Sequence, residues 1–291
     1  MPELPEVEGL ARFLASRLDG RTVRAVEIGA ISALKTFSPA PSDLAGAAVV
    51  DVTRHGKWVD LVMAAPTGEL LHLVFHLSRA GWLRWYEQVP ATPVRPGKSP
   101  LALRVRLDDG SGFDLTEQGT RKRLAVHVVR EPQEIELVAS LGVDPLGPDF
   151  TVERFGELLA ARSQQLKGLL RDQRQIAGIG NAYSDEILHA AHLSPFALSR
   201  SLDADTVALL HRTIREVLSQ ALEAAAGRPA AELKDAKRRG MQVHGRTGLP
   251  CPVCGDTVRE VSFADSSLQY CPTCQTGGRP LADRRMSRLL R

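Results

Sequence analysis

Four cysteines constrain the fold of this chain more than any other feature, because all four lie in one cluster near the C-terminus. They occur as Cys251-x2-Cys254-x16-Cys271-x2-Cys274 in a chain of 291 residues. Each C-x2-C turn directs two sulfurs at one point, and the 16 residues between the pairs suffice for a two-stranded hairpin that joins them. We therefore expect one zinc ion in a closed four-thiolate site, which holds the fold and takes no part in the chemistry.

Two disulfide bonds are the alternative use of the same cysteines. Disulfides persist mainly in secreted proteins, and nothing else in the sequence suggests secretion. The chain begins Met-Pro-Glu-Leu-Pro-Glu, with no basic segment ahead of an apolar run. No uninterrupted stretch of about 18 apolar residues occurs, which is the length that a membrane helix needs. We expect a cytoplasmic protein with no membrane partner.

Basic residues are concentrated toward the C-terminus. The net charge of +3 is too small by itself to indicate a polyanionic partner. Residues 228–291, however, hold 12 Lys and Arg against 6 Asp and Glu, whereas residues 1–150 hold 17 against 19. A solvated C-terminal surface and a surface that contacts phosphates both fit this excess, so the charge alone does not decide between them.

The first half of the chain is predicted to be β-rich after a single helix. Apolar residues recur at helical spacing over residues 5–18, which end at an Asp-Gly stop signal. Residues 21–130 consist of short Val- and Leu-rich runs, such as 70–75 and 101–107, between Gly, Asp and Pro turns. Residues 90–99 are rich in Pro and are expected to form an exposed loop.

The second half is predicted to be helical after a domain boundary near residues 140–150. Periodic apolar residues predict four helices, over residues 151–161, 163–172, 182–190 and 203–225. Asp203 is the expected N-cap of the last helix. Residues 228–250 are predicted to form a basic loop, and residues 251–274 a small hairpin held by the metal. The predicted fold class is α+β.

A glycine-containing turn lies between two of the predicted helices. Gly178 and Gly180 permit a tight reversal, and the helix that follows would direct backbone N–H groups and its positive dipole end at a phosphate. The side chain of Asn181 could add a donor. A plain connection between helices fits the same residues, because a G-x-G spacing is weak evidence on its own.

Pro2 is a candidate nucleophile. Removal of Met1 would expose its secondary amine, and an α-amino group is partly unprotonated at neutral pH because it titrates at about pH 7.7–8.0. Such an amine can attack an aldehydic sugar carbon. Glu3 and Glu6 are candidate acid/base groups, or merely first-turn carboxylates that the helix dipole favours.

Several motifs together resemble one family. In chain order they are Met1-Pro2-Glu3-Leu4-Pro5-Glu6-Val7-Glu8, Gly56-Lys57, His76-Leu77, Lys167, Ala177-Gly178-Ile179-Gly180-Asn181, Val243-x-Gly245-Arg246 and the four cysteines. This order resembles the formamidopyrimidine-DNA glycosylase and endonuclease VIII family throughout the chain. Several independent motifs at matching spacing argue against an accidental similarity.

The resemblance implies both a fold and a reaction. The fold is an N-terminal β-sandwich with flanking helices over residues 1–140, a helix–two-turns–helix DNA-binding domain over 141–228, and a basic loop with the zinc finger over 229–291. The reaction is excision of a damaged base and β/δ-elimination at the abasic site through a Schiff base on Pro2. Glu3 would handle protons at the sugar, and Lys57 would contact phosphate and the lesion nucleotide.

The resemblance also assigns phosphate contacts around a flipped nucleotide to His76, Lys167 and Asn181. Extrusion is required because C1′ is buried in the stacked duplex, and unstacking costs on the order of a few kcal/mol that these contacts must offset. Damaged DNA is therefore the expected partner. We expect a monomer that binds it with strong salt dependence.

The residues that fill the gap left by the flipped base depart from the family pattern. Relatives that excise oxidised guanine commonly use a Met after a His-Leu-Gly stretch, together with an Arg and a Phe from a later loop. Here Arg79 follows a His-Leu-Ser stretch, and Lys122 and Leu124 stand where the Arg and Phe are usual. A long cationic side chain contacts the orphan base differently, so the sequence leaves the opposite-base preference open.

Two further departures from the family pattern concern contacts with DNA. Ser266 stands at the position of the usual finger-tip Arg, and His244 at that of the usual Tyr before Gly245-Arg246. Loss of the arginine removes a charge-assisted phosphate contact. The loop over residues 228–242 is also short compared with the loop that caps oxidised guanine in relatives. A more open damaged-base pocket is therefore expected.

Two functions of different classes follow. The first is a bifunctional DNA glycosylase and abasic-site lyase. The alternative is a catalytically weak or non-canonical member that binds abasic, bulky or crosslinked lesions, which the altered gap-filling residues suggest. Retention of Pro2, Glu3 and Lys57 favours the enzyme. A third possibility, an RNA-binding ribbon protein, would leave the Pro-Glu start unexplained.

Overall fold

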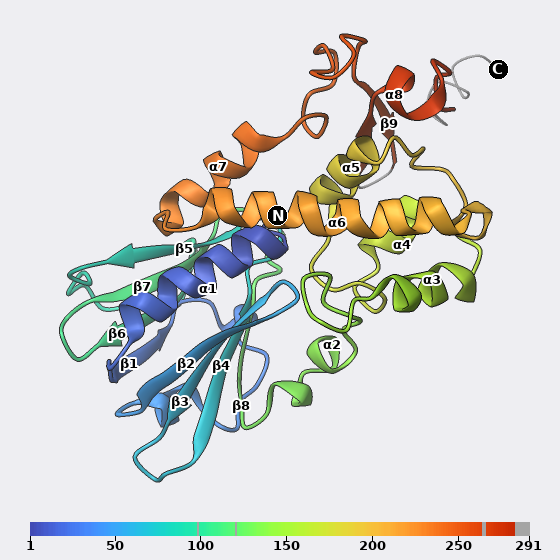
Figure 1. Cartoon of the computed structure of the whole chain (residues 1–291). Helices are drawn as coiled ribbons and strands as arrows, with labels where there is room; N and C mark the ends of the chain where they lie inside the picture. The colour runs from blue at the N-terminus through green and yellow to red at the C-terminus, as the bar shows by residue number, and fades with distance from the viewer. Residues whose placement is uncertain (98, 120, 264–265, 283–291) are drawn as a thin grey trace. The chain divides into compact units, whose positions relative to one another are not determined.

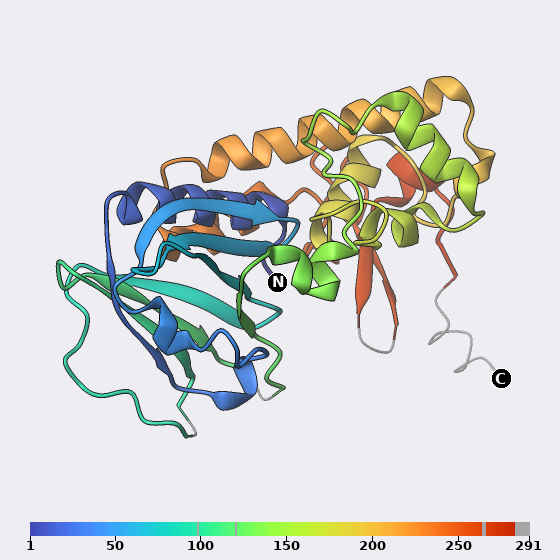
Figure 2. The same ribbon diagram turned by 90° about the horizontal axis from the view of Figure 1, so that it is seen from below.

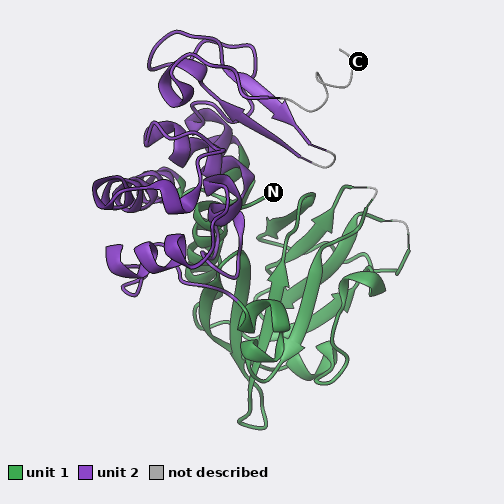
Figure 3. Cartoon of the chain, turned by 90° about the vertical axis from the view of Figure 1, so that its right-hand side faces the viewer, with its two compact units in different colours: residues 1–140, 225–234 green, residues 141–224, 235–291 purple. Residues whose placement is uncertain are grey.

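A computed structural model describes residues 1–97, 99–119, 121–263 and 266–282. The chain forms two compact units, shown in different colours in Figure 3. Unit 1 consists of residues 1–140 with 225–234, and unit 2 of residues 141–224 with 235–291. Within the described residues, no helix is long and apolar enough to cross a membrane.

Unit 1 is a sandwich of two four-stranded antiparallel sheets, which confirms the predicted β-rich domain (Figure 1). One sheet has the order β1-β6-β7-β5, and the other has the order β2-β3-β4-β8. The strands are β1 (Val23–Ile28), β2 (Ala48–His55), β3 (Trp58–Ala64), β4 (Leu70–His76), β5 (Gly81–Tyr86), β6 (Leu101–Leu107), β7 (Gly112–Glu117) and β8 (Ala125–Val129).

The core of unit 1 follows from the alternation of apolar side chains along these strands. Leu61, Phe75 and Phe113 are completely buried and belong to one hydrophobic cluster. Successive side chains of a strand point to opposite faces, so each sheet presents one apolar face to the other. Residues 90–97 form the expected connection between strands and are largely exposed.

Helix α1 (Leu4–Leu18) covers this sandwich along β2 and β3 (Figure 2). Its apolar stripe, which includes Leu10 and Leu14, is completely buried. The short elements of unit 1 are η1 (Ile31–Ala33), η2 (Pro41–Leu44), η3 (Pro132–Glu134), α2 (Glu136–Ala139) and η5 (Ala230–Glu232). The early helix predicted over residues 5–18 is therefore confirmed, and it begins one residue sooner.

The four helices predicted in the second half are confirmed. They are α3 (Val152–Ala161), α4 (Leu166–Arg171), α5 (Asn181–Ala190) and α6 (Ala204–Ala225). Helix α4 begins at Leu166, whereas the pattern predicted a start at residue 163. Asp203 is the N-cap of α6, as expected, because its Oδ1 accepts a hydrogen bond of 2.8 Å from the backbone N–H of Thr206.

The segment that was predicted as a basic loop, residues 228–250, instead contains a helix. Helix α7 (Leu233–Gly240) has Asp235 in its first turn and three basic residues in its last turn, an arrangement that the helix dipole stabilises. The side chain of Leu233 is buried in the core of unit 1, which anchors the start of α7. The prediction relied on charge and missed this single apolar anchor.

The predicted hairpin at the C-terminal end of unit 2 is confirmed. Strands β9 (Arg259–Ser262) and β10 (Ser267–Tyr270) pair in antiparallel fashion, and α8 (Pro272–Thr276) follows them. Unit 2 also contains η4 (Ser199–Ser201). Val261, Leu268 and Tyr270 form a small buried cluster beneath the hairpin.

Candidate functional site

The N-terminus of unit 1 is held by the first turn of α1. Pro2 is buried, and Glu3 is only 2% exposed. Glu3 is the N-cap of α1, and its backbone N–H donates a hydrogen bond of 2.9 Å to Oε2 of Glu6. Glu6 therefore satisfies a helix terminus, the structural role that the sequence left open. Glu3 stays the candidate for proton transfer that the resemblance to the family implies.

Lys57 lies in a two-residue hairpin turn between β2 and β3. His55 pairs with Trp58 across the turn, and Gly56 has a φ of +56°, a conformation that glycine adopts without a steric cost. The guanidinium of Arg54 donates to the carbonyl of Gly56 at 3.1 Å. The Lys57 side chain is almost fully buried, with the residue 7% exposed.

An ion pair ties this hairpin turn to α1. Nε of Arg54 donates to Oε2 of Glu8 at 2.9 Å, and the Arg54 side chain is only 9% exposed. The same glutamate accepts from Arg12 at 2.8 Å on the helix surface. Glu8 thus connects the helix that carries Glu3 to the turn that carries Lys57. Sequence reasoning missed Arg54, although a basic residue before a Gly-Lys turn is visible in the chain.

His76 ends β4 and faces Trp58, with ring centroids 4.8 Å apart. Its Nδ1 accepts a hydrogen bond of 3.1 Å from the backbone N–H of Ser78. Burial, and next the charge of Lys57, lower the pKa of His76 to about 4. The ring is therefore neutral at physiological pH and carries its hydrogen on Nε2, where it can donate to an anion.

Arg79 lies in the tight turn between β4 and β5 and is exposed. Ser78 precedes it with a φ of +54°, in the left-handed region that favours glycine. The turn lies beside the connection between β7 and β8, because the backbone N–H of Gln118 donates to the carbonyl of Ala80 at 3.3 Å. Arg79 is thus presented on a turn whose backbone is fixed from both sides.

Leu124, to which the sequence assigned a gap-filling role, lies in the interior of unit 1. Leu124 is 1% exposed and belongs to the hydrophobic core of unit 1. Its backbone N–H and that of Arg123 donate to Oε1 of the buried Glu117, at 3.1 and 2.8 Å. These two hydrogen bonds hold the connection between β7 and β8 against the sandwich. Leu124 consequently packs inward, whereas Lys122 and Arg123 before it are exposed.

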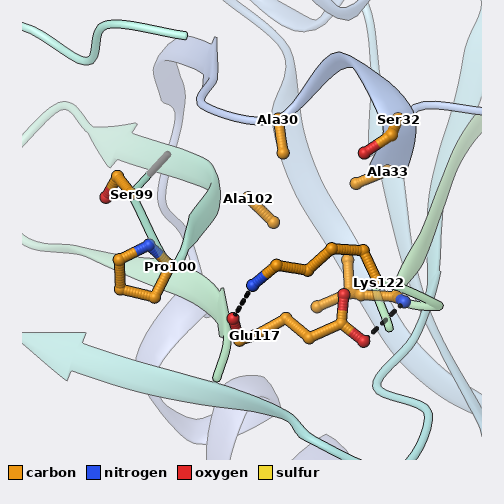
Figure 4. Close-up of a pocket in the computed structure, with 9 residues that line it drawn as sticks. Ala30, Ser32, Ala33, Ser99, Pro100, Ala102, Glu117 and Lys122 are labelled. Carbon is orange, nitrogen blue, oxygen red and sulfur yellow. Dashed lines mark hydrogen bonds between the residues drawn. The ribbon is translucent and has the colours of Figure 1, made fainter. Parts of the chain in front are cut away.

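Lys122 is exposed, and its side chain lines a small pocket of unit 1 (Figure 4). Its Nζ donates to the backbone carbonyl of Glu117. The remaining walls come mainly from small side chains and proline: Ala30, Ser32, Ala33, Ser99, Pro100, Ala102 and Leu124. Contact of Lys122 with an orphan base would first require this hydrogen bond to break.

Lys167 of unit 2 is directed inward and not to the surface. Lys167 is 5% exposed, and its Nζ donates to Oδ1 of Asp185 at 2.6 Å and to Oγ of Ser184 at 2.8 Å. It also donates to the carbonyl of Asn181 at 3.1 Å. These acceptors match the three donors of an ammonium group. The Lys167 ammonium is therefore bonded to three groups of α5, and a direct phosphate contact stays a prediction.

Asn181 begins α5 directly after the glycine turn, as the sequence predicted. Its Nδ2 donates to the backbone carbonyl of Ser267 in β10 at 2.8 Å. Its Oδ1 is buried and has no partner among the described residues. Asn181 thus links the turn to the zinc-finger hairpin. Gly178 in that turn has a φ of +90°, which explains the glycine there.

Asp185 and Glu186 are buried acidic residues of α5 that sequence reasoning missed. The Asp185 side chain is completely buried between Lys167 and His244, whose Nδ1 lies 2.8 Å from Oδ2. Glu186 accepts from the backbone N–H groups of Gln242, Val243 and His244 at 2.7, 3.0 and 2.8 Å. A buried Asp-Glu pair is costly without partners, so this motif was a signal that a basic or N–H-rich segment would pack on the helix.

The four cysteines converge as the spacing predicted. All four Sγ atoms lie within 4.8 Å of one another, and the sulfurs of Cys254 and Cys271 are 3.4 Å apart. A tetrahedral site with Zn–S bonds of about 2.3 Å has sulfurs about 3.8 Å apart, so the cluster fits one zinc ion. Nε2 of His189 lies 3.3 Å from Sγ of Cys251, a contact typical of the residues that support structural metal ligands.

The finger tip joins β9 to β10. Residues 264 and 265 of the expected tip lie outside the described residues. The backbone N–H of Phe263 donates to the carbonyl of Ser266 at 2.7 Å. Arg259, at the start of β9, is exposed and is a candidate for the phosphate contact that the usual tip arginine would make.

Family models match the chain in three segments. Residues 1–126 match the formamidopyrimidine-DNA glycosylase N-terminal domain, residues 141–231 its H2TH domain, and residues 248–277 a zinc finger found in FPG and IleRS. A formamidopyrimidine-DNA glycosylase from Symbiobacterium thermophilum is 36% identical over 287 residues, covering 94% of this chain and 89% of the relative. An uncharacterized formamidopyrimidine-DNA glycosylase-like protein from Mycobacterium tuberculosis is 58% identical over 152 residues, covering 52% of this chain and 95% of the relative.

Solved structures show the same fold along almost the whole chain. The Fpg of Lactococcus lactis in complex with DNA that contains an abasic site matches with a TM-score of 0.80 and 26% identity, over 94% of this chain and 99% of that chain. The MutM (FPG) protein of Thermus thermophilus matches with a TM-score of 0.77 and 32% identity, over 96% and 100%.

Proposed function

The chain belongs to the formamidopyrimidine-DNA glycosylase family of bifunctional DNA repair glycosylases and abasic-site lyases, and from this premise we propose how its own residues perform the reaction. Pro2 supplies the nucleophile, Glu3 moves protons at the sugar, and Lys57 holds the lesion nucleotide. The observation that carries this assignment is the N-terminal turn, in which the adjacent residues Pro2 and Glu3 are both buried at the start of α1.

The proposed chemistry begins when the Pro2 nitrogen attacks C1′ of the damaged nucleotide. The bond from C1′ to the base breaks, and the base leaves with that electron pair and takes up a proton. The Pro2 nitrogen loses its proton, the C1′–O4′ bond then breaks with its electron pair going to O4′, which takes up a proton, and the opened sugar is left joined to Pro2 as an iminium ion at C1′. Loss of a C2′ proton to a base, for which Glu3 is the candidate, expels the 3′ phosphate, and a second elimination expels the 5′ phosphate. Hydrolysis of the remaining imine would free Pro2.

Positive charge and fixed donors support the same assignment. The hairpin turn of Lys57 is fixed to α1 through Arg54 and Glu8, so its ammonium group approaches the sugar from a rigid position. His76 adds a neutral N–H donor, which is suited to a phosphate oxygen. In unit 2 we propose phosphate contacts from the start of α5 at Asn181. We further propose that Arg79 and Arg123 contact the orphan base.

The binding partner and the division of labour along the chain follow from the same assignment. We propose that the substrate is DNA with a damaged base or an abasic site, bound by a monomer in the cytoplasm. Three functional segments, residues 1–140, 141–228 and 229–291, are proposed for catalysis, DNA binding and zinc-supported DNA contact. A non-cleaving lesion-binding protein is not favoured, because Pro2, Glu3 and Lys57 are all present and the matching relatives are glycosylases.

The decisive experiment is trapping of the imine. The protein is incubated with DNA that contains an abasic site, together with borohydride, which reduces the imine to a stable crosslink. Wild type is expected to crosslink, whereas a variant with a residue that blocks the Pro2 amine is expected to give none. Mass spectrometry of the crosslinked peptide locates the bond and shows whether Met1 has been removed. Crosslinking of the blocked variant at the wild-type level would refute Pro2 as the nucleophile.

A further inference from the structure

A buried carboxylate in unit 1 lies on the strand between β2 and β4 (Figure 1). It belongs to Asp60 of β3, whose neighbours Val59 and Leu61 are buried in the core of the unit. Because successive side chains of a strand point to opposite faces, Asp60 lies on the face of the sheet that is turned away from this core. Asp60 is nevertheless only 1% exposed. A carboxylate buried to this extent needs hydrogen-bond donors around it.

Two histidines from the neighbouring strands supply these donors. Nε2 of His55 lies 3.0 Å from Oδ2 of Asp60, and Nδ1 of His72 lies 2.9 Å from Oδ1. Since a carboxylate only accepts, each ring carries a hydrogen on the nitrogen that faces Asp60. Both contacts run diagonally across the ladder, because His55 pairs with Trp58 of β3 and His72 pairs with Val62. We call His55, Asp60 and His72 together the carboxylate bracket.

The carboxylate bracket joins the two strands that lead to proposed site residues. His55 is the last residue of β2 and stands two positions before Lys57. His72 lies on β4, which ends at His76, and the two histidines share one face of the strand because they are four residues apart. The bracket therefore fixes the strand that leads to Lys57 against the strand that ends at His76.

A metal site is the other use to which two histidines and an aspartate could be put. Among the residues that the structure describes, only the four cysteines bring ligand atoms close enough together to share an ion. In the carboxylate bracket, each histidine instead approaches the carboxylate at a hydrogen-bond distance. The arrangement thus favours mechanical support of the neighbouring strands over metal binding.

We propose that the carboxylate bracket positions the Lys57 turn relative to His76 for the reaction at the abasic sugar. Asp60 is then a positioning residue, which acts through the strands and does not touch the substrate. The inference rests on the proposed function in taking Lys57 and His76 as site residues. A displacement of about 1 Å at a group that contacts the substrate can lower a rate by about a hundredfold. Loss of the bracket is therefore expected to slow imine formation more than it weakens DNA binding.

The test measures imine formation and DNA binding separately in Asp60→Leu, Asp60→Asn and wild type. The rate constant comes from the time course of borohydride trapping at saturating protein on DNA that contains an abasic site. Leucine fills a similar space without accepting hydrogen bonds, so Asp60→Leu should lower this rate constant by about tenfold or more. Asp60→Asn keeps one acceptor oxygen, and its rate constant should lie between those of Asp60→Leu and wild type.

Binding is measured with duplex DNA that contains a tetrahydrofuran abasic analogue, which cannot form an imine. The dissociation constant should rise by less than about threefold in Asp60→Leu, because most contacts with the DNA backbone come from other segments. A large loss of rate with a small loss of affinity is the result that misplacement of a reacting group predicts.

A double-mutant cycle separates positioning from a general loss of stability. In the Lys57→Met background the ammonium group that the carboxylate bracket positions is absent. Addition of Asp60→Leu to this background should therefore lower the rate constant by less than about threefold. A defect that acts only through folding would lower it by the same factor in both backgrounds. The slower reaction of Lys57→Met is followed over a longer trapping time.

Asp114→Asn is the matched control in the other sheet of unit 1. Asp114 of β7 is 3% exposed, and it accepts from Nε of Arg104 at 2.7 Å and from the hydroxyl of Tyr86 at 3.1 Å. Its partners lie on β6 and β5, in the sheet that does not carry the Lys57 turn. Urea unfolding should show at least as large a loss of stability for Asp114→Asn as for Asp60→Asn. The rate constant of imine formation should nevertheless stay at the wild-type value.

Three results would overturn the inference. They are a wild-type rate constant in Asp60→Leu, an equal factor for this substitution in the wild-type and Lys57→Met backgrounds, and a loss of rate in Asp114→Asn as large as in Asp60→Asn. Should Asp60→Leu fail to fold, Asp60→Asn takes its place in each comparison. Trapping by wild type together with any of these results would refute the positioning role alone, whereas absence of trapping by wild type would refute the proposed function.

Discussion

Two histidines, His76 in unit 1 and His244 in unit 2, are held through the same ring nitrogen in opposite senses. Nδ1 of His76 accepts from the backbone N–H of Ser78, whereas Nδ1 of His244 donates to the carboxylate of Asp185. The first arrangement, together with burial, keeps the ring neutral with a hydrogen on Nε2. The second places a hydrogen on Nδ1 instead. The two rings thus offer opposite nitrogens as hydrogen-bond donors within the protein.

Lys57 in unit 1 and Lys167 in unit 2 also differ in how they are held. Lys57 lies in a hairpin turn whose backbone is fixed by Arg54, whereas Lys167 donates to Asp185, Ser184 and the carbonyl of Asn181 beneath α5. The sequence assigned DNA contacts to both. Both lysines are almost fully buried, so what distinguishes them is the element that holds each one, a hairpin turn for Lys57 and α5 for Lys167.

Removal of zinc should have the largest effect and should act on unit 2 only. Structural zinc sites contribute on the order of 10 kcal/mol to the folding of the segment that binds them. Chelation is therefore expected to unfold residues 251–274 and to remove the hairpin that supports Asn181 and Gly245. DNA affinity should fall by more than about a hundredfold, as measured with the abasic analogue, while the circular dichroism of the unit 1 sheets persists. A zinc-free protein with unchanged DNA affinity would contradict the expectation that the zinc-held hairpin supports DNA binding.

Lys167→Met should cost more stability than any other lysine substitution discussed, because it leaves Asp185 buried without its ammonium partner. Loss of one member of a buried pair costs about 3–5 kcal/mol. Urea unfolding of the whole protein measures the change. The double variant Lys167→Met/Asp185→Asn should recover part of the loss, since it removes the unpaired charge. Lys57→Met is the comparison, because it should abolish most cleavage at a smaller cost in stability. If Lys57→Met instead cost more stability and Lys167→Met abolished more cleavage, Lys167 and not Lys57 would be the lysine needed for the reaction.

His76 should make folding sensitive to acid. Its folded pKa of about 4 lies below the value of 6.5 for an unperturbed histidine, so the unfolded chain binds the proton more strongly. The resulting stability is fully present above pH 6.5 and is lost as the pH falls toward 4. The full shift corresponds to about 3 kcal/mol. The free energy of chemical unfolding should therefore differ less between pH 7 and pH 4.5 for His76→Gln than for wild type, and an equal difference would exclude a folded-state ring that stays neutral.

The exposed arginines beside the gap should give the smallest effect. Arg79→Ala and Arg123→Ala are each expected to weaken binding of the abasic analogue by about 1 kcal/mol, about fivefold. Lys122→Ala should change it less, because the Lys122 ammonium is bonded to the carbonyl of Glu117. Measurement opposite each of the four bases would show which orphan base these arginines favour. A larger loss for Lys122→Ala than for Arg123→Ala would support the sequence-based assignment of Lys122.

Local patterns were sufficient for the elements and for the metal site. The spacing of the cysteines predicts convergence because two short turns and one hairpin close the site with few alternatives. The helices of the second half followed from their apolar periodicity. Helix α7 was missed because its fold depends on Leu233, a single residue whose burial is set by the core of unit 1. A basic segment with one apolar residue has no periodic signal to detect.

The β-sandwich, the helices, the zinc cluster and the candidate nucleophile at Pro2 could all be predicted from the chain, since each depends on residues close together in it. The inward or outward direction of the side chains could not. Leu124 is buried because Glu117 folds the strand connection back, and Lys167 is buried because Asp185 lies one α5 turn after Asn181. Burial and charge pairing join residues from distant segments, so the direction of a side chain, and with it the distinction between ligand contact and support, is set by the tertiary structure and is absent from local pattern.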